Sequence, residues 1–435
     1  MKNWIEISER RLTTNYKTLV QSAGTAVSVL AVIKADAYGH GAALCAPVLA
    51  RAGATWLGVT DAKEGVQIQE EFAHEKIVDT PRILIMSGSL PEEARMIVLR
   101  DLTPVVWSIE ELEALAAEAK AQQKQLPVHV EIDTGMSRQG CAVGDELQSI
   151  LNWFTAQNAL TLDGIMTHFS SAEIAGSPIS TEQRQAFEQA IAQIKASGLQ
   201  PQWVHAGNSS AVDNLHPFAT PNAAVATTDC HSERSAKRAV EEPPHSARSA
   251  TEATAPTSLE WLVQQAATLN AKAMVRTGLA LYGHCLPVES ASGYTGPHEA
   301  SVQSRLLPVL TWKARVIGLR DIAAGTHVGY GATFTAPHPM RLALLPVGYA
   351  DGLRRELSSS PTGAGWVMLH GQRASIVGRV SMNLTVVDIT HIAAVAIGDE
   401  AIILGEGITA EDHARIAGTI SYEILCGMKS HTLLS

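Results

Sequence analysis

The sequence is organised around one stretch, Ala31-Val32-Ile33-Lys34-Ala35-Asp36-Ala37-Tyr38-Gly39-His40-Gly41. Residues 27–33 are almost wholly apolar, which predicts a buried strand, and residues 42–52 suit a helix. Lys34 therefore lies where a strand passes into a βα loop, the usual position of active-site groups in α/β folds. Apolar neighbours there can lower the pKa of a lysine, so that its neutral amine acts as a nucleophile toward a carbonyl. The alternative is a lysine that ends a strand and points into water.

Apolar segments of strand length recur along the chain and alternate with helical stretches. They are residues 27–33, 55–59, 82–86, 103–107, 127–132, 161–167, 202–206 and 273–276, separated by helices such as 91–99, 108–123 and 180–196. Eight strands that alternate with helices predict a parallel (β/α)8 barrel, an α/β fold of the TIM type. We expect this barrel domain over residues 8–290, beginning with a helix at residues 8–22.

Polar residues follow several of these strands at the point where each strand ends. Lys34 follows the first, Arg138 the fifth, His168 the sixth, Asn208 and Ser209 the seventh, and Arg276 and Gly278 end the eighth. The carboxyl ends of barrel strands meet at one mouth, so these side chains are expected to converge there. The pattern therefore predicts a site at that mouth without reference to any known family.

The second half of the chain changes character twice. Residues 223–257 have mixed charge and no apolar period, which predicts a disordered insertion; the spacing of Cys230, His231 and His245 matches no common zinc site. Short strands are then expected at 309–316, 341–347, 366–370, 384–389 and 401–404, separated by Gly, Pro and Asp turns. They predict a mostly β C-terminal domain over residues 300–435.

Composition excludes several classes of function. The formal net charge of -10 argues against a nucleic-acid surface, and no apolar run reaches the roughly 18 residues of a membrane span. The five cysteines are dispersed without a C-x-x-C pair, and the N-terminus lacks the apolar core of a signal peptide. We therefore expect reduced thiols, a cytoplasmic protein and no bound metal.

The stretch from Ala31 to Gly41 closely resembles the pyridoxal-phosphate attachment motif of alanine racemases, which are fold-type III pyridoxal-phosphate enzymes. Residues 328–334, V-G-Y-G-A-T-F, resemble the family's tyrosine motif, and residues 378–383, G-R-V-S-M-N, also match. The resemblance runs through nearly the whole chain. It implies an isomerase that interconverts L-alanine and D-alanine by a two-base mechanism and so supplies D-alanine for peptidoglycan synthesis.

The resemblance also implies a role for individual residues. Lys34 would hold pyridoxal 5'-phosphate as a Schiff base and remove the proton from D-alanine. Tyr330, reaching in from the partner subunit of a homodimer with shared active sites, would remove the proton from L-alanine, and His168 would assist. The phosphate would be bound by the hydroxyls of Tyr38, Ser209 and Tyr422 and by the backbone N–H groups of Asn208, Gly278 and Leu279. Arg276 would face the pyridine nitrogen, and Arg138 and Met382 would bind the substrate carboxylate.

Three features leave alternatives open. Glu131 replaces a lysine that is sometimes carbamylated in the family, and it either orients Arg138 with its own charge or faces water. The tail, residues 428–435, departs from the family pattern, so the final strand is missing or replaced; residues 2–7 are expected to pair with the C-terminal domain. Rival functions are racemisation of another small amino acid such as serine, a non-catalytic pyridoxal-phosphate-binding protein, and a damaged, inactive racemase.

Overall fold

The computed structural model describes residues 1–214, 256–295, 300–359 and 364–435. The insertion expected at 223–257 therefore lies outside the described residues, except for its last two positions. Pro256 and Thr257 lead into helix α10 (Ser258–Thr268), where the Thr257 side chain accepts a hydrogen bond from the Glu260 N–H. This is the capping box that starts many helices.

Eight parallel strands of the described chain close into a barrel, which confirms the predicted fold. In chain order they are β2 (Val27–Val32), β3 (Trp56–Val59), β4 (Arg82–Ile85), β5 (Thr103–Val106), β6 (Leu126–Asp133), β8 (Leu160–Met166), β10 (Trp203–His205) and β11 (Lys272–Thr277). Each pairs with its neighbours in sequence, β11 pairs with β2, and the pairing of β5 with β6 completes the ring. Each of these strands is mostly buried, because a parallel barrel sheet is covered on both faces.

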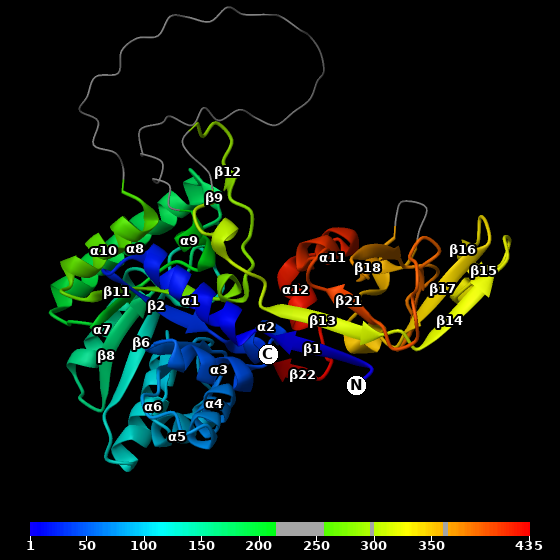
Figure 1. The fold of residues 1–435 in the computed structure, drawn as a ribbon. Coiled ribbons are helices and arrows are strands. Elements are labelled where there is room, and N and C mark those ends of the chain that lie inside the picture. The colour runs from blue at the N-terminus through cyan, green and yellow to red at the C-terminus, as the bar shows by residue number, and fades with distance from the viewer. Residues whose placement is uncertain (215–255, 296–299, 360–363) are drawn as a thin grey trace, which may run out of the picture.

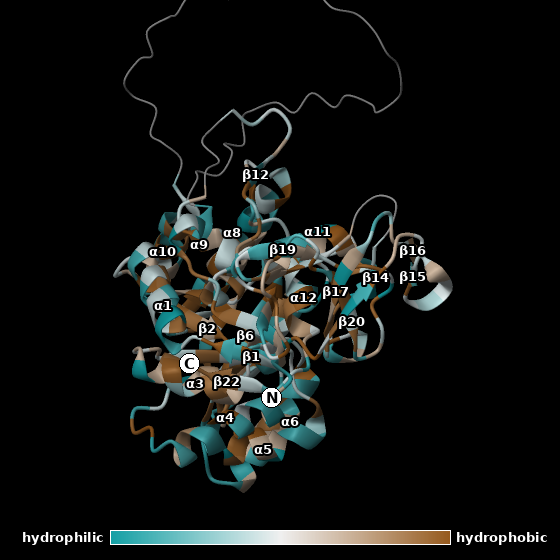
Figure 2. Cartoon of the chain, turned by 45° about the vertical axis from the view of Figure 1, so that its right-hand side comes forward, coloured by the Kyte–Doolittle hydropathy of each residue, from teal (hydrophilic) through white to brown (hydrophobic). Residues whose placement is uncertain are grey.

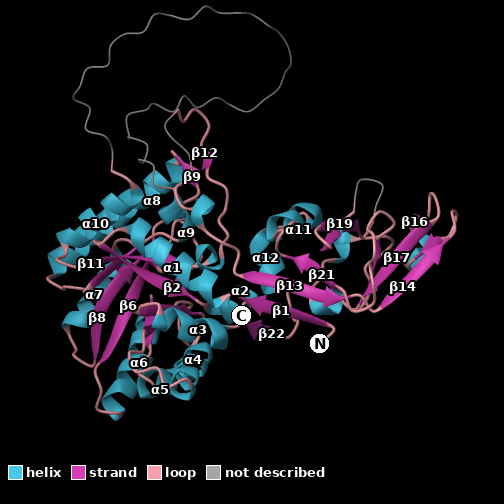
Figure 3. Cartoon of the chain, viewed as in Figure 1, coloured by secondary structure: helices cyan, strands magenta, loops and turns pink. Residues whose placement is uncertain are grey.

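Helices surround the barrel on the outside (Figures 1 and 3). Besides α10 they are α1 (Glu9–Ala23), α3 (Ala42–Arg51), α4 (Ala62–His74), α5 (Ala94–Leu99), α6 (Ile109–Ala121), α7 (Asp145–Thr155) and α8 (Pro178–Ser197). Each presents an apolar stripe to the strands, as α1 does with Leu12, Tyr16 and Leu19. Figure 2 shows the result, with hydrophobic strands such as β2 enclosed by helices that carry hydrophilic outer faces.

The second domain is mostly β, as predicted. Its main sheet has the order β19 (Gln372–Ser375), β18 (Trp366–Leu369), β21 (Glu400–Leu404), β13 (Leu310–Arg315), β1 (Asn3–Ile7) and β22 (Thr432–Leu434). A three-stranded sheet of β14 (Gly318–Ile322), β17 (Met340–Leu345) and β20 (Thr385–Asp388) follows, with a hairpin of β15 (His327–Val328) and β16 (Phe334–Thr335). The domain also contains helices α11 (Ala410–Ala417) and α12 (Ser421–Cys426), which the strand pattern did not predict.

The first and last strands of the chain lie side by side in this sheet (Figure 1). Strand β1 pairs antiparallel with β13 and parallel with β22, with Ile5 opposite Thr432. Of the two alternatives for the tail, a missing or a replaced final strand, the first is wrong, because the altered tail supplies three residues that extend the sheet. Within the described residues, every helix is too short or too polar to cross a lipid bilayer.

One continuous apolar core joins the barrel to the main sheet of the second domain. A separate small core lies at the far end of that domain, under the β15–β16 hairpin, and consists of Val328, Ala336, Met340, Leu342 and Val377. The hairpin therefore has its own packing, away from the barrel mouth. This separation bears on where Tyr330, at the hairpin tip, can act.

Candidate active site

A pocket of about 390 Å³ opens at the carboxyl ends of the barrel strands. Its lining includes ten of the twelve site residues that the sequence predicts: Lys34, Tyr38, Arg138, His168, Asn208, Ser209, Arg276, Gly278, Leu279 and Tyr422. Nine of them come from the barrel domain, and Tyr422 comes from α12 of the second domain. The convergence expected from the strand ends is therefore present in one chain, whereas Tyr330 and Met382 lie elsewhere.

The backbone after Lys34 forms a left-handed turn, α2 (Lys34–Gly39), which the sequence did not predict. Four successive non-glycine residues, 35–38, have φ between 50° and 55°. Such a conformation costs roughly 1–2 kcal/mol per residue, so neighbouring groups must hold it. Glu64 does so by accepting hydrogen bonds from the N–H groups of Ala35 at 2.9 Å and Thr60 at 2.7 Å. Glu64 is thus a supporting residue of the site that sequence reasoning missed.

Lys34 has the electrostatic setting of a nucleophile. Burial lowers its pKa, and the positive charges of Arg138 and Arg276 lower it further against the opposing effect of Glu64. A lower pKa leaves more of the amine neutral at physiological pH, which is the form that attacks a carbonyl. The alternative of a lysine that points into water is wrong, because Lys34 is part of the pocket wall and is partly buried.

Hydroxyl and backbone N–H donors gather at one end of the pocket. The Ser209 hydroxyl accepts hydrogen bonds from the N–H groups of Gly278 at 3.0 Å and Ala280 at 3.2 Å, at the start of the short helix η2 (Leu279–Tyr282). Gly278 lies directly against Tyr38, and a Cβ there would collide with the Tyr38 hydroxyl. The Tyr38 and Tyr422 rings lie 5.9 Å apart. Burial raises the pKa of Tyr422 to about 12, so its hydroxyl keeps its proton and can donate.

This donor set fits a phosphate group. It combines neutral hydroxyl donors with a helix N-terminus, which is a favourable arrangement for an anion. The missing side chain of Gly278 leaves room for the Tyr38 hydroxyl. Asn208, which caps the short helix α9 (Ser209–Asp213) by accepting from the Ser210 N–H at 3.0 Å, lies at the same end.

A buried arginine and a histidine form the opposite wall. Arg276 is 4% exposed and donates from Nη2 to the Thr167 carbonyl at 2.7 Å, with the His168 Nδ1 at 3.3 Å. Burial lowers the pKa of Arg276 to about 10, with Glu131 opposing the change, so the guanidinium is still cationic at neutral pH. Burial and the charges of Arg276 and Arg138 lower the pKa of His168 to about 3. His168 is therefore neutral, accepts from Arg276 at Nδ1, and carries its proton on Nε2.

Glu131 and Gln139 form a pair beneath Arg138. Glu131 is 2% exposed, so the reading in which it faces water is wrong. Its partner among the described residues is the Gln139 amide, which also donates to the Met86 carbonyl at 2.8 Å. Burial raises the pKa of Glu131. Gln139 lines the pocket beside Arg138 and was missed by sequence reasoning, although it immediately follows the arginine in the chain.

Tyr330 and Met382 lie on the second domain, outside the pocket. Tyr330 is 69% exposed at the tip of the β15–β16 hairpin, and Met382 is 56% exposed. Gly329 and Gly331, on either side of Tyr330, lie close to the backbone and the side chain of Arg379, so the hairpin tip packs on the loop that leads to Met382. Figure 1 shows this hairpin at the end of the domain that points away from α2 and the barrel. Within one chain the pocket therefore lacks both residues.

Comparisons with known proteins agree over the whole chain. The family model for the alanine racemase N-terminal domain matches residues 7–222, and the model for the alanine racemase C-terminal domain matches residues 309–433. The chain is 32% identical over 430 residues to an alanine racemase of Syntrophobacter fumaroxidans, covering 98% of this chain and 95% of that one.

Solved structures show the same likeness. The alanine racemase from Streptomyces coelicolor A3(2) is 27% identical, with a TM-score of 0.77, and the match covers 100% of this chain and 97% of that one. The alanine racemase from Bartonella henselae, with covalently bound pyridoxal phosphate, is 24% identical with a TM-score of 0.74, and both chains are covered fully, at 100%. The second likeness shows a shared fold.

Proposed function

The chain belongs to the alanine racemase family, and on that premise we propose that it interconverts L-alanine and D-alanine with pyridoxal 5'-phosphate held covalently by the Lys34 amine. The observation that carries the proposal is that Lys34, the hydroxyl and N–H donors and the Arg276–His168 wall line one and the same pocket. In the cell this activity would supply D-alanine for peptidoglycan.

Different pocket residues would bind the cofactor phosphate, the cofactor ring and the substrate carboxylate. Bound pyridoxal phosphate supplies the chemistry that makes an amino-acid α-proton acidic, because its ring spreads the resulting negative charge. Tyr38, Ser209, Tyr422 and the N–H groups at Asn208, Gly278 and Leu279 would bind its phosphate. Arg276 would lie at the pyridine nitrogen, and since a guanidinium only donates, it would leave that nitrogen unprotonated. Arg138 would bind the substrate carboxylate.

Racemisation needs a proton taken from one face and delivered to the other, so two bases are expected. Lys34 would serve D-alanine with its neutral amine, favoured by its lowered pKa. Tyr330 would serve L-alanine, with His168 assisting. Because Tyr330 and Met382 are exposed and do not line the pocket of their own chain, we propose that both enter the pocket of a partner in a head-to-tail homodimer.

The activity is tested directly with purified protein and added pyridoxal phosphate. We expect interconversion of L- and D-alanine, loss of it in Lys34→Ala, and full activity in the matched exposed variant Lys63→Ala. Protein that takes up the cofactor on Lys34 but turns over neither enantiomer would refute the proposal. Turnover of serine exceeding that of alanine in the same assay would instead favour a racemase for another small amino acid.

A further inference from the structure

A row of buried polar side chains runs through the barrel interior behind the pocket. It starts at Arg276, whose Nη1 lies 3.2 Å from the His205 Nδ1, and continues from the His205 Nε2 to the His129 Nδ1 at 2.8 Å. The His129 Nε2 lies 3.3 Å from the Asp163 Oδ2, which Arg82 contacts at 2.8 Å from the other side. The first four residues are at most 5% exposed, whereas the Arg82 side chain is 39% exposed. The row therefore links the pocket wall to the opposite end of the barrel.

The direction of every hydrogen bond in this row follows from its first member. A guanidinium has donors and no acceptor, so His205 must accept at Nδ1 and carry its proton on Nε2. That proton points at the His129 Nδ1, which must accept in turn, so His129 carries its proton on Nε2 and donates it to Asp163. Both imidazoles are consequently neutral and of the same tautomer. Asp163, an acceptor at the end of the row, completes the pattern.

The local backbone is built to hold this row. The register between β6 and β8 shifts at His129, where Val128 pairs with Leu162 but His129 pairs with Gly164, so Asp163 is the extra residue of a bulge. Gly164 gives the His129 ring its space, because a Cβ there would lie 2.6 Å from the ring. Trp56 covers the far end, with the Arg82 guanidinium 4.0 Å above its ring and His129 at 5.4 Å.

The charges agree with this arrangement. Burial opposes ionisation of Asp163, but the hydrogen bond from His129 and the positive charge of Arg82 outweigh it and lower its pKa. Burial lowers the pKa of His129 and of His205. Asp163 is thus an ionised, buried carboxylate. Its hydrogen-bonded connection to Arg276 runs through two neutral imidazoles.

We propose that Asp163 is a positioning residue of the racemase: it accepts the last hydrogen bond of the row, which holds the His129 and His205 rings in place and through them the Arg276 guanidinium against the pocket. The proposal rests on the proposed function, in which Arg276 faces the cofactor ring. A buried polar group of purely structural value would stabilise the fold without setting the position of Arg276. The two roles differ in what happens to His205 and to cofactor binding when Asp163 is changed.

The first test is ¹⁵N NMR of histidine-labelled wild-type protein, with and without pyridoxal phosphate. His129→Gln and His205→Gln variants assign the two rings among the 16 histidines of the chain. We expect both rings to be neutral with the proton on Nε2 at pH 7. A proton on the Nδ1 of either ring, or a charged imidazole, would overturn the proposal without any need for a variant.

The second test compares substitutions of Asp163. Asp163→Leu removes the acceptor of the His129 Nε2 proton, so the ¹⁵N signals of His129 and His205 should shift, the dissociation constant for pyridoxal phosphate should rise about tenfold, and kcat/KM for alanine should fall about tenfold. Asp163→Asn keeps an acceptor but not the charge, and its effects should be smaller. Asp101→Asn is the matched control, because Asp101 pairs with Lys124 at 2.7 Å on the barrel exterior; it should leave cofactor affinity and both tautomers unchanged.

A double-mutant cycle checks that Asp163 acts on cofactor affinity through His129. In the His129→Gln background, Asp163→Asn should change cofactor affinity no further, and this arm remains available if Asp163→Leu does not fold. Unchanged cofactor affinity and unchanged ¹⁵N signals of His129 and His205 in the Asp163 variants, with only lower thermal stability, would show a structural role and overturn the proposal. If wild-type protein binds the cofactor but does not racemise alanine, the proposed function fails, while the tautomer and binding results still decide the role of Asp163.

Discussion

At the scale of single residues, the end of the pocket proposed to bind phosphate depends on one missing side chain. Gly278 has φ and ψ of -118° and -91°, with φ in the ordinary negative range, so its importance lies in space rather than in backbone freedom. Its Cα faces the Tyr38 hydroxyl, while its N–H donates to Ser209 at 3.0 Å. The glycine thus lets a tyrosine hydroxyl, a serine hydroxyl and a helix N-terminus share one small volume.

Gly278→Ala should therefore weaken cofactor binding while the fold survives. The added methyl group would displace the Tyr38 hydroxyl, and loss of one well-placed hydrogen bond to a charged group, about 1.5–3 kcal/mol, corresponds to a rise in the pyridoxal-phosphate dissociation constant of about 10- to 100-fold. Titration with the cofactor, followed by absorbance, measures it. Gly318→Ala is the control, because a Cβ there meets ordinary contacts at 3.7 Å. Equal affinities of the two variants would contradict this account of Gly278.

The sequence could predict most of the pocket residues because each one directly follows a strand or lies in a recognisable motif. It could not predict Glu64 or Gln139, since their roles depend on contacts to backbone that lies far away in the chain or in an unexpected conformation. Glu64 binds the N–H of Ala35, 29 positions earlier, and the left-handed turn that makes this possible consists of residues that usually avoid it. Nothing in the local residue pattern signals such a turn.

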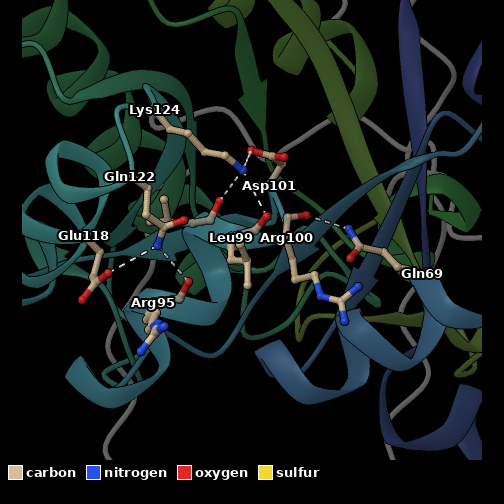
Figure 4. Close-up of polar contacts among 9 residues, drawn as sticks. Gln69, Arg95, Leu99, Arg100, Asp101, Glu118, Gln122 and Lys124 are labelled. Atoms are coloured by element: carbon tan, nitrogen blue, oxygen red, sulfur yellow. Dashed lines mark hydrogen bonds and ion pairs between the residues drawn. The ribbon is translucent and has the colours of Figure 1, made fainter.

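At the scale of elements, short barrel helices depend on side chains from their neighbours. Figure 4 shows the C-terminal end of α5, where Lys124 donates from Nζ to the carbonyls of Val98 at 2.9 Å and Leu99 at 3.0 Å and pairs with Asp101 at 2.7 Å. Gln122 reaches the Arg95 carbonyl at 3.2 Å from the same side. A helix of six residues is unstable by itself, so these caps on its last carbonyls matter for its position.

Lys124→Met should lower the free energy of unfolding by about 1–2 kcal/mol, because it leaves two helix-end carbonyls and Asp101 without their cationic donor. Urea denaturation followed by circular dichroism measures the change. The matched variant Lys120→Met removes an exposed lysine near the end of α6 and should cost less than about 0.5 kcal/mol. A difference of zero between the two variants would show that Lys124 does not hold α5.

Long elements were predictable from sequence and short ones were not. The eight barrel strands follow the apolar segments to within one or two residues, because a strand buried on both faces has a continuous apolar signature. Strands of two residues, such as β15 and β16, have no period to detect. Strand β22 was doubted because its residues differ from the family pattern, yet backbone pairing with β1 requires no particular side chains.

At the scale of the whole molecule, the interior holds histidines that folding keeps uncharged. Burial lowers the pKa of His40 and His168 to about 3 and that of His413 to about 4, and it also lowers the pKa of His129 and His205. In the unfolded chain each would titrate near its usual pKa of about 6.5. As the pH falls through that value, the unfolded state takes up protons that the folded state excludes.

The protein should therefore lose stability below pH 6.5. The pKa of each of these histidines is lower in the folded state than in the unfolded chain. Its contribution to the free energy of unfolding is therefore fully present above about pH 6.5 and is lost as the pH falls toward the folded pKa. The loss is up to about 1.4 kcal/mol per pH unit for each histidine. Urea midpoints at pH 7.5, 6.5 and 5.5 should fall steeply in the last interval. His413→Gln should make the free energy of unfolding less dependent on pH, by up to about 1.4 kcal/mol per pH unit, which corresponds to one bound proton. Equal midpoints at pH 7.5 and 5.5 would mean that these histidines are charged in the fold.

The central claim about the molecule is that its two domains contribute residues to two different active sites. One chain brings together the lysine, the phosphate donors and the arginine–histidine wall, but its Tyr330 lies exposed at the far end of the second domain. Under the proposed function, a complete site needs Lys34 from one chain and Tyr330 from another.

Subunit mixing of Lys34→Ala with Tyr330→Phe protein tests this claim most directly. Each variant alone should be nearly inactive, since loss of a positioned acid–base group costs about 10² to 10⁴ in rate. A mixed dimer would hold one intact site and one doubly damaged site, so alanine racemisation should return to at most about half of the wild-type rate per mixed dimer. Proven mixed dimers that regain no activity would contradict the account, because Tyr330 would then serve its own chain or would not be the second base.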